Sequence, residues 1–319
     1  MSAEHALKHT DAFGKLEHGA DGSAVRWHSL IDHMIDVAAC FQRLAHCRSI
    51  RRAMEKTSGR QPTEQDIARL SVLAFLHDIG KANSGFQAKR WKNGIPAAWP
   101  VRIVAGHGRE TCKLFEVPTA AAALEPLIEQ ICTWGAACDS LLSASISHHG
   151  RPIKDCTGGG VTIWKTQAGA YDPAAVLKTI ADCGLTLYPL AFQPGGDCLP
   201  EKPAFGHLFA GLVQLADWLG SDTRFFKFSD PGEARAARAP ELADEAITTL
   251  GLDAEDWRDR LIATTPGFAS TFGGFPPHPI QAAMADDSLR PLVILESETG
   301  SGKTEAALWR YLQLFRAGE

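Results

Sequence analysis

Several features that would define a class of protein are missing from this sequence. No apolar run reaches the ~18 residues that cross a membrane, and the first residues lack the pattern of a secretory signal. No membrane partner is therefore expected. The eight cysteines include no Cys-x-x-Cys pair, which favours reduced thiols in a cytoplasmic protein. Basic residues do not dominate, since 32 Lys and Arg stand against 37 Asp and Glu. That balance excludes a surface coated with positive charge but allows a local basic groove.

The apolar residues that are present indicate a helical protein. They make up 45% of 319 residues, enough for a sizeable core in one large domain or two of ordinary size. Their spacing is mostly helical, and residues 1–24 are expected to form a loose lead-in. Helices are predicted at 27–45, 67–76, 120–131, 141–147, 173–183, 205–219 and, with more polar character, within 229–265. The predicted fold class is mainly α.

The dipeptide His77-Asp78 is the first candidate for chemistry. An imidazole nitrogen and a carboxylate both bind metal ions, and the two carboxylate oxygens can bridge a pair of ions. The helix predicted over 67–76 leads into this dipeptide. Gly80 follows where a left-handed residue commonly ends a helix. A His-Asp pair alone is a weak signal, so its meaning depends on ligands elsewhere in the chain.

Other polar residues occupy positions where a metal would explain them. His107 lies between two glycines at the expected start of a helix, and His148-His149 closes an apolar helix. Asp217 lies inside an apolar helix, where an unpaired carboxylate is costly. His33 shares a helix face with Asp36, although a single histidine there is more often structural.

Together these residues supply enough ligands for two ions that keep open sites for water. Imidazole-rich ligand sets favour Mn, Fe, Co, Ni or Zn over Mg. Seven scattered structural residues are a poor alternative, given the His-Asp and His-His pairs. The predicted metal ligands are His33, His77, Asp78, His107, His148, His149 and Asp217.

The character of the sequence changes near its C-terminal end. Residues 291–296 form the best predicted strand, and a Gly-rich loop ending in Gly302-Lys303-Thr304 follows, then a helix over 305–315. Strand, loop and helix in this order are the context of a phosphate-binding loop. The predicted phosphate-binding residues of a nucleotide site here are Thr299, Gly300, Ser301, Gly302, Lys303 and Thr304.

Two segments combine positive charge with other signals. Residues 48–60 carry five basic side chains, which form either a solvated helix face or a phosphate-contacting one. Residues 86–92 interleave basic and aromatic side chains, a mixture that suits phosphates and stacked bases but is also common on ordinary surfaces.

The order of these motifs resembles that of the HD-domain metallohydrolases. It is most similar to the HD nuclease domain of the type I CRISPR-associated helicase-nuclease family, followed by the start of its superfamily 2 helicase domain. The matching segments cover most of 25–225 and are 30–38, 77–81, His107, 147–150 and 216–222. Many HD phosphohydrolases share the His-Asp core, whereas Ala216-Asp217-Trp218 and the helicase start separate this family from them.

The resemblance implies a metal-dependent nuclease that cuts single-stranded DNA in CRISPR antiviral defence. Its implied partners are an ATP-driven helicase and a Cascade-type surveillance complex. One ion would take His33, His77, Asp78 and Asp217, and the other Asp78, His107, His148 and His149. The implied catalytic residues are Asp78, Lys81 and Ser221, the latter two facing the scissile phosphate, while Asp36 would orient a ligand histidine. Phe275 and Gln281 resemble the element that reads adenine in that helicase domain, which implies that Gln281 binds ATP together with the loop residues 299–304.

The predicted domains are an HD nuclease domain at 1–265, a linker and adenine-motif region at 266–290, and the truncated start of a RecA-like helicase domain at 291–319. The chain ends fifteen residues after Thr304, without an Asp-Glu-x-His box. Productive ATP hydrolysis and unwinding are therefore not expected from it, and ATP would serve only the full-length helicase.

Two other functions stay open from sequence alone. An HD phosphohydrolase acting on nucleotides or phosphomonoesters would have a small closed pocket rather than an open groove. A docking module with purely structural metals is the other possibility. The helicase start and the basic-aromatic segment favour the nuclease.

Overall fold

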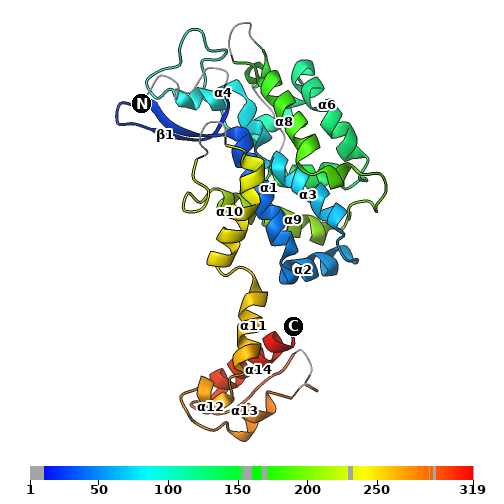
Figure 1. Ribbon diagram of the computed structural model, residues 1–319, viewed down its shortest axis with the longest axis vertical. Coiled ribbons are helices and arrows are strands. Elements are labelled where there is room, and N and C mark those ends of the chain that lie inside the picture. The colour runs from blue at the N-terminus through cyan, green and yellow to red at the C-terminus, as the bar shows by residue number, and fades with distance from the viewer. Residues whose placement is uncertain are drawn as a thin grey trace. The chain divides into compact units, whose positions relative to one another are not determined.

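The computed structural model describes residues 11–151, 153, 160–166, 171–228, 233–286, 288–289 and 292–318. The chain divides into two compact units, residues 1–250 and 251–319. Both are built mainly from helices (Figure 1), which confirms the predicted fold class. No helix among the described residues is both long and apolar enough to span a membrane.

The first unit contains a small sheet and ten α-helices within its described residues. The strands are β1 (Phe13–His18) and β2 (Ala24–Ser29). The α-helices are α1 (Leu30–His46), α2 (Arg48–Ser58), α3 (Glu64–Phe75), α4 (Ser84–Gln87), α5 (Gly108–Leu114), α6 (Pro118–Cys132), α7 (Cys138–Ile146), α8 (Pro173–Leu187), α9 (Pro203–Gly220) and α10 (Arg235–Thr249). The 3₁₀ helices are η2 (Leu76–Ala82), η3 (Ala88–Arg90), η4 (Val161–Trp164) and η5 (Pro189–Phe192).

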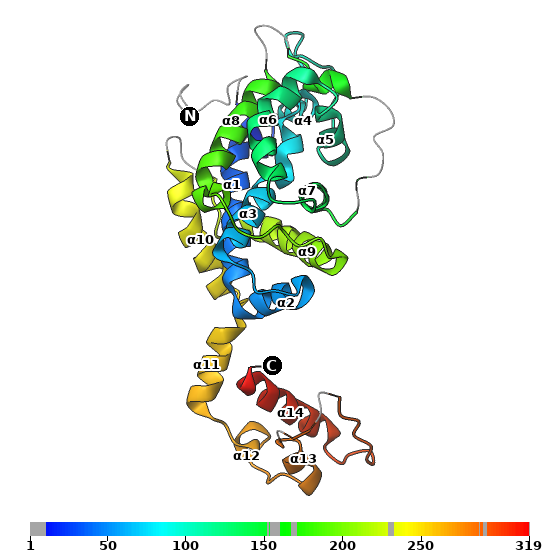
Figure 2. The ribbon, with the colours of Figure 1, turned by 90° about the vertical axis from the view of Figure 1, so that its right-hand side faces the viewer.

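Helix α1 is the central element of the first unit. It packs against α3, α9 and α10, and Figure 2 shows α3 and α9 crossing it. The hydroxyl of Ser29 accepts a hydrogen bond from the backbone of Asp32 and so caps its first turn. Because neighbours surround this helix, even its polar residues His33 and Asp36 are fully buried.

Helix α3 delivers the His77-Asp78 pair to the interior. A capping box between Thr63 and Asp66 starts this helix, and its residues from Asp66 to Phe75 are all buried. The chain then tightens into η2 and carries both residues of the pair, each 1% exposed. The prediction that the pair follows a core helix is confirmed.

The N-terminal region differs from the prediction. β1 and β2 pair as an antiparallel hairpin, so the expected loose lead-in is wrong over 13–18, while residues 1–10 lie outside the described part. The hairpin is tied to the unit because the amide of Phe13 donates to Gln87 Oε1 at 3.0 Å, and Gln87 Nε2 donates to Phe13 O at 3.0 Å. Since β2 extends to Ser29, α1 begins at Leu30 instead of residue 27.

The second unit contains α11 (Ala254–Thr264), α12 (Phe268–Thr271), α13 (Pro279–Ala283) and α14 (Lys303–Ala317). Its core cluster joins Phe268, Met284, Ala306 and Trp309. The strand predicted at 291–296 is wrong over the described residues 292–296, which form no strand. Val293 and Leu295 pack on the core cluster while Leu292 and Ile294 are exposed. Packed and exposed side chains therefore alternate along 292–295 as in a strand, but no strand among the described residues pairs with this segment.

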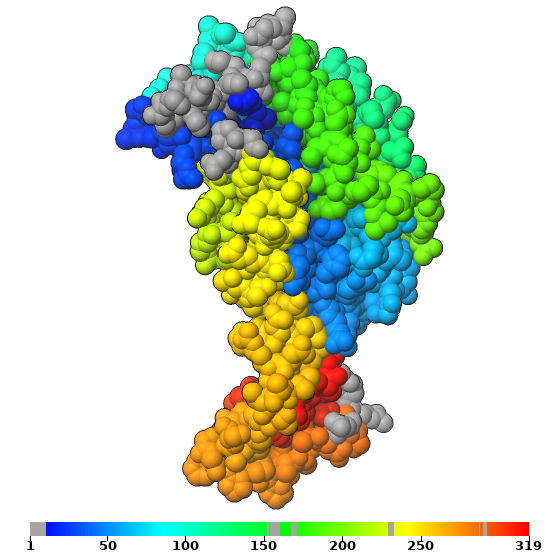
Figure 3. Space-filling model, in the orientation of Figure 1, coloured from blue at the N-terminus to red at the C-terminus, as the bar shows by residue number. Residues whose placement is uncertain are grey.

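Helix α10 is fixed to α1 by a buried ion pair. Arg235 Nε donates to Asp36 Oδ1 at 2.7 Å and Nη2 donates to Oδ2 at 2.9 Å, with both side chains nearly inaccessible. His28 Nε2 lies 2.8 Å from Asp36 Oδ2. Figure 3 shows α10, in yellow, lying against blue residues of α1. The prediction that Asp36 orients a ligand histidine is wrong, because Asp36 instead binds His28 and Arg235.

We expect Arg235→Ala to destabilise the first unit by about 3–5 kcal/mol, because it leaves the Asp36 carboxylate buried and unpaired. Chemical unfolding followed by circular dichroism measures the change. Arg238→Ala is the matched control, since Arg238 pairs with Glu241 on the exposed face of the same helix and should change stability by less than about 1 kcal/mol. Equal losses of unfolding free energy in the two variants would show that the buried Arg235–Asp36 pair contributes no more to stability than an exposed pair.

Candidate metal centre

All seven predicted ligands lie together in the first unit. Helices α1, α5 and α7 pack against η2, and α9 packs against α1 and α7. The contributing residues are His33 on α1, His77 and Asp78 on η2, His107 just before α5, His148 and His149 just after α7, and Asp217 on α9. Two groups of these side chains have spacing suitable for a metal ion: His33, His77, Asp78 and Asp217, and His107, His148 and His149.

The Asp78 carboxylate lies between the two groups. Its Oδ2 is 3.1 Å from His33 Nε2 and 3.2 Å from His77 Nε2. Its Oδ1 is 3.3 Å from His107 Nε2 and 3.7 Å from His148 Nε2. Each oxygen therefore faces a different group of imidazoles, which is the arrangement that a bridging carboxylate requires.

Unpartnered polar atoms test whether this cluster fits a metal. His33 Nε2, His77 Nε2 and both oxygens of Asp78 are buried and make no hydrogen bond. Buried polar atoms in proteins are nearly always hydrogen-bonded, and these four converge on one point, where the Lys81 ammonium lies beside Asp78 Oδ2 as an ion-pair partner. Asp217 Oδ1 lies 3.5 Å from His33 Nε2 and 3.7 Å from His77 Nε2. This donor set fits a divalent cation.

Two of the histidines are oriented by backbone carbonyls. Nδ1 of His77 lies 3.0 Å from Ala74 O, and Nδ1 of His148 lies 3.0 Å from Ser145 O. A ring that donates its Nδ1–H to a carbonyl keeps Nε2 as a lone-pair donor. Helix ends thus set the tautomer that metal binding needs at both residues.

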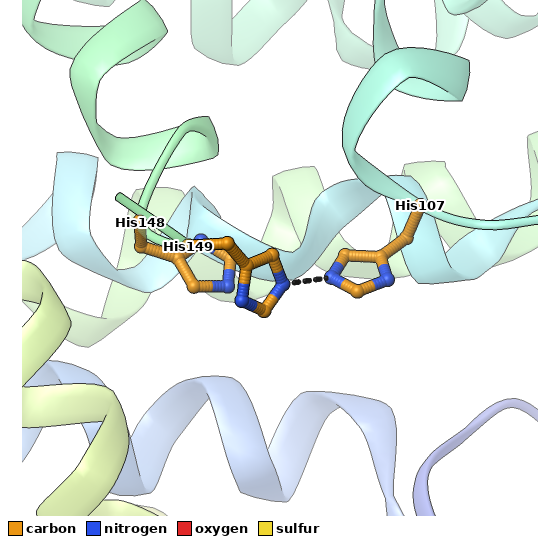
Figure 4. A group of neighbouring side chains, drawn as sticks. All are labelled: His107, His148 and His149. Atoms are coloured by element: carbon orange, nitrogen blue, oxygen red, sulfur yellow. Dashed lines mark hydrogen bonds between the residues drawn. The ribbon is translucent and has the colours of Figure 1, made fainter. Parts of the chain in front are cut away.

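The second group faces the first from the α5 and α7 side. Figure 4 shows the rings of His148 and His149 side by side with that of His107 opposite. Nε2 of His107 and Nε2 of His149 are 2.7 Å apart. His148 is buried, His107 is half-buried and His149 is exposed. The group is therefore open to solvent on the His149 side, whereas the first group is closed.

Electrostatics keep most of these groups in the form that binds metal. Burial disfavours the Asp78 carboxylate, but the charges of Lys81 and His77 outweigh burial and hold its pKa well below the usual range. For Asp217, burial is likewise outweighed by the nearby imidazoles of His33 and His77, so its pKa is also lowered. Burial lowers the pKa of His33.

Metal binding to the first group is expected to release a proton from His77. Burial disfavours the charged form of this imidazole, but the adjacent Asp78 carboxylate outweighs burial and raises its pKa. Because only neutral imidazole binds a metal, affinity should rise with pH until His77 has lost its proton. Calorimetric titration with Mn²⁺ in buffers of different ionisation enthalpy measures the proton released.

The second group is an internal control for that titration. Burial lowers the pKa of His107 to about 4 and that of His148 to about 3, so both are neutral at neutral pH. Their ion should bind without releasing a proton from them. Equal proton release with both ions, or none with the first, would contradict this account.

The two other predicted catalytic residues also lie at the centre. Lys81 Nζ is 2.5 Å from Asp78 Oδ2 and donates to Gly14 O at 3.2 Å. Ser221 Oγ donates to Asp217 Oδ1 at 3.2 Å. A cation and a hydroxyl thus border the first group, on η2 and at the end of α9.

Gly80 has a different role from the predicted one. It is not a left-handed helix end, because its φ is not positive. A Cβ at this position would lie 1.9 Å from His107 O and 2.2 Å from Thr111 Oγ1. The glycine is needed because the start of α5 rests directly on η2. This close approach brings His107 to Asp78.

Residues 86–92 do not form an exposed stacking surface. Phe86 and Arg90 are buried, and the Arg90 guanidinium lies over the rings of Phe13, Trp91 and Trp99. The expectation of a basic-aromatic face for bases is therefore wrong for most of the segment. Lys89 differs from its neighbours, since its ammonium lies 4.0 Å from the centroid of the Phe86 ring.

The predicted ATP-binding residues lie in the second unit. Gly300 and Gly302 have φ of 82° and 77°, and α14 starts at Lys303. Gln281 Nε2 donates to Gly302 O at 3.1 Å, which places this residue against the loop. Lys303 Nζ donates to the carbonyls of Ser297 and Glu298. Thr299, Ser301 and Thr304 belong to the same loop and to the first turn of α14, and Phe275 is exposed. The ATP-binding role of these residues stays a prediction.

Sequence reasoning missed two residues of the hairpin. A Cβ on Gly14 would lie 2.9 Å from His33 Cβ, so this glycine lets β1 lie directly on a candidate ligand. Lys15 follows it and interacts electrostatically with Asp217, Lys81 and Asp78. Neither residue stands in a motif, and short polar strands give little periodic signal.

Comparison with known proteins identifies the family. CRISPR-associated endonuclease/helicase Cas3 of Thermus thermophilus is 29% identical over 315 residues, which cover 92% of this chain and 32% of that protein. A solved chain titled "Crystal structure of CRISPR-associated protein" is 22% identical with a TM-score of 0.62, covering 98% of this chain and 35% of that one. A chain of "CRISPR RNA-guided surveillance complex, pre-nicking" is 20% identical with a TM-score of 0.57, covering 97% and 35%. These two structures show similarity of fold.

The chain spans about a third of the length of the curated relatives it matches. Its residues 13–226 match the family model described as "Cas3, HD domain". This range contains all seven candidate ligands, Lys81 and Ser221. Because the match covers more than half of the chain, the protein belongs to the Cas3 HD-domain family, as the order of its motifs predicted.

Proposed function

We propose that this chain is a metal-dependent nuclease that hydrolyses phosphodiester bonds of single-stranded DNA in CRISPR antiviral defence. The observation that carries the proposal is the position of Asp78, with one oxygen toward each of two imidazole groups. A shared carboxylate suits a pair of ions that act on one phosphate. Family membership and the openness of the second group support a polymeric substrate over a small enclosed one.

Each residue has a proposed part in the reaction. His33, His77 and Asp217 would hold one ion with Asp78, and His107, His148 and His149 would hold the other with the same carboxylate. When bound, the ions supply Lewis-acid stabilisation of the phosphate charge and activate water. The Lys81 ammonium adds a fixed positive charge beside Asp78. Ser221 holds Asp217 through its hydroxyl and borders the position of the scissile phosphate.

The ligand chemistry narrows the choice of metal. Five imidazoles and two carboxylates favour Mn, Fe, Co, Ni or Zn, while Mg prefers a shell of oxygens. We propose two such ions per chain. The count is measurable by elemental analysis after desalting.

Partners are proposed from the relatives. The curated relatives are named endonuclease/helicase, and the second unit places Gln281 against a Gly-rich loop at a helix start. We propose that the nuclease works in the cytoplasm with an ATP-driven helicase part and is recruited by a surveillance complex. ATP binding is assigned to the helicase part and not to the cleavage reaction.

Metal-dependent cutting of circular single-stranded DNA, without ATP, tests the proposal. Chelator-sensitive cleavage by the wild type, absent in Asp78→Ala, is the expected result. Two bound ions with no DNA cleavage but with turnover of nucleotides or p-nitrophenyl phosphate would replace the proposal with the phosphohydrolase function. Bound metal with no turnover of any of these substrates would leave only a docking role and overturn the proposal.

A further inference from the structure

Three lysine side chains surround the candidate metal centre. Lys81 on η2 lies against Asp78 Oδ2. Lys89 on η3 lies 4.0 Å from the Phe86 ring centroid, and Lys81 Nζ lies 5.6 Å from the same centroid. Lys15 on β1 interacts electrostatically with Lys81 and with both carboxylates of the centre. Like charges are thus gathered at one site by three separate elements.

The two outer lysines lie toward different ligand groups. Lys15 acts on Asp217 and also on Asp222, both near the end of α9. Lys89 acts on His107 and Glu110, at the start of α5. The Lys81 ammonium, beside the bridging carboxylate, interacts with both of them. Lys81 is therefore near both outer lysines: its Nζ and that of Lys89 lie 5.6 and 4.0 Å from the Phe86 ring centroid, and its Nζ donates to the carbonyl of Gly14, next to Lys15.

Neither outer lysine has an anionic partner. Within the described residues, the ammonium groups of Lys15 and Lys89 make no hydrogen bond and have no carboxylate within ion-pair distance. The nearby Asp222 is already paired with Arg224 at 2.5 Å, and Glu110 accepts from the amide of Gly106 at 3.0 Å. Both lysines are half-buried, and burial lowers the pKa of Lys15 to about 8. A half-buried cation without a counter-charge is costly, so an arriving anion would offset that cost.

The charge balance of the centre also favours an anion. The two carboxylates among the candidate ligands, Asp78 and Asp217, face three ammonium groups, while the neighbouring Asp222 is paired with Arg224 and Glu110 accepts from the amide of Gly106. Divalent ions on the ligand groups would add further positive charge and engage both carboxylates. A ligand with several negative charges in a row matches this field better than a single small anion.

We propose that Lys15 and Lys89 bind backbone phosphates of the DNA strand on either side of the scissile phosphate, which faces Lys81. The proposal rests on the nuclease function above and names further positioning residues for the same site. Lys15 would hold the strand on the Asp217 side and Lys89 on the His107 side. Their contribution is to affinity and register, because neither contacts the candidate ligand groups directly.

Salt-dependent DNA binding without metal separates this role from catalysis. The full chain is titrated against a fluorescein-labelled oligodeoxythymidine in EDTA at neutral pH, between about 50 and 200 mM salt. Each phosphate contact to single-stranded DNA contributes about 0.7 to the salt slope. Lys15→Gln and Lys89→Gln should each reduce the slope by about that amount and weaken binding about 5-fold near 0.1 M salt. Lys15→Arg keeps the charge and should keep the slope.

A matched control and a kinetic readout complete the test. Lys178→Gln removes an exposed charge on α8 that is paired with Asp182. Lys178 belongs to neither ligand group, so this variant should leave slope and cleavage unchanged. With Mn²⁺ added, Lys15→Gln and Lys89→Gln should raise KM about 5-fold and keep kcat. Unchanged melting temperatures exclude a merely structural effect.

The outcomes distinguish this proposal from the nuclease function. A wild type that cuts DNA while both glutamine variants keep its slope and KM overturns the phosphate-binding role and leaves the nuclease function intact. Wild-type binding that is absent or independent of salt also overturns the role. A wild type that binds with the expected slope changes but never cuts would support the lysine contacts and count against the nuclease.

Discussion

Asp78→Asn is expected to lower the rate of DNA cleavage by about 10³-fold or more. Asparagine keeps the size of the side chain but replaces one carboxylate oxygen with an NH₂ group, which does not bind a metal ion, and removes the negative charge. Both groups of imidazoles face this carboxylate, at 3.1 Å from His33 Nε2 and 3.3 Å from His107 Nε2. Since each oxygen faces one group, the variant should bind both ions more weakly. Single-turnover cleavage rates and elemental analysis of bound metal measure the two effects.

Asp222→Asn is the matched control for that variant. Asp222 lies just beyond the end of α9 and pairs with Arg224, but it belongs to neither ligand group. Its replacement should keep both ions and at least about a third of the activity, because loss of a partly exposed ion pair costs less than about 1 kcal/mol. Full activity and full metal content in Asp78→Asn would refute the bridging role.

The candidate centre could be predicted largely because its ligands follow helical patterns. The histidines His77, His107 and His148 stand at or near helix termini, where apolar periodicity stops and a polar residue needs a reason to be inward. Periodicity also showed that Asp217 falls within an apolar helix. Helical periodicity therefore marked each ligand separately, and the order of the motifs along the chain indicated that they form one site.

The hairpin was not predictable in the same way. β1 contains Phe13, Gly14 and Lys15 in a short polar strand with register shifts, so neither a period of two nor a helical period stands out. Its role depends on long-range contacts, such as that of Lys81 with Gly14 O, which no local pattern contains. The same reason explains the error at 292–296, where strand propensity depends on a neighbour to complete the hydrogen bonds.

Segment 86–92 shows a further limit. A basic and aromatic composition does not state which side of the chain is buried, and here Phe86 and Arg90 point into the unit while Lys89 stays half-exposed. Similarly, the spacing of Asp36 and His33 suggested that Asp36 orients a ligand histidine, but its partners are His28 and Arg235, and Arg235 is 199 residues away. Partners at that separation follow from tertiary packing and not from spacing.

Gly80→Ala is expected to remove the second ion while leaving the first group in place. The added Cβ would lie 1.9 Å from His107 O and 2.2 Å from Thr111 Oγ1, both in the first turn of α5 or just before it. The backbone of His107 cannot lie 1.9 Å from a carbon atom, so α5 must move away from η2. His107 Nε2 would then leave its position 3.3 Å from Asp78 Oδ1. Elemental analysis should fall from two ions toward one, and cleavage should fall about 100-fold or more.

The stability of the variant should fall as well, because overpacking a buried site costs about 1–3 kcal/mol, or several degrees in melting temperature. Gly108→Ala separates the steric effect from the loss of a glycine. Gly108 is the first residue of α5, and a Cβ there meets nothing within 4 Å, so this variant should keep both ions and its activity. If Gly80→Ala also kept both, η2 and α5 could separate without disturbing His107, and their close contact would have no part in building the centre. If Gly80→Ala alone loses the second ion and the activity, then the absence of a side chain at Gly80 is what allows α5 to pack on η2 and to bring His107 to Asp78.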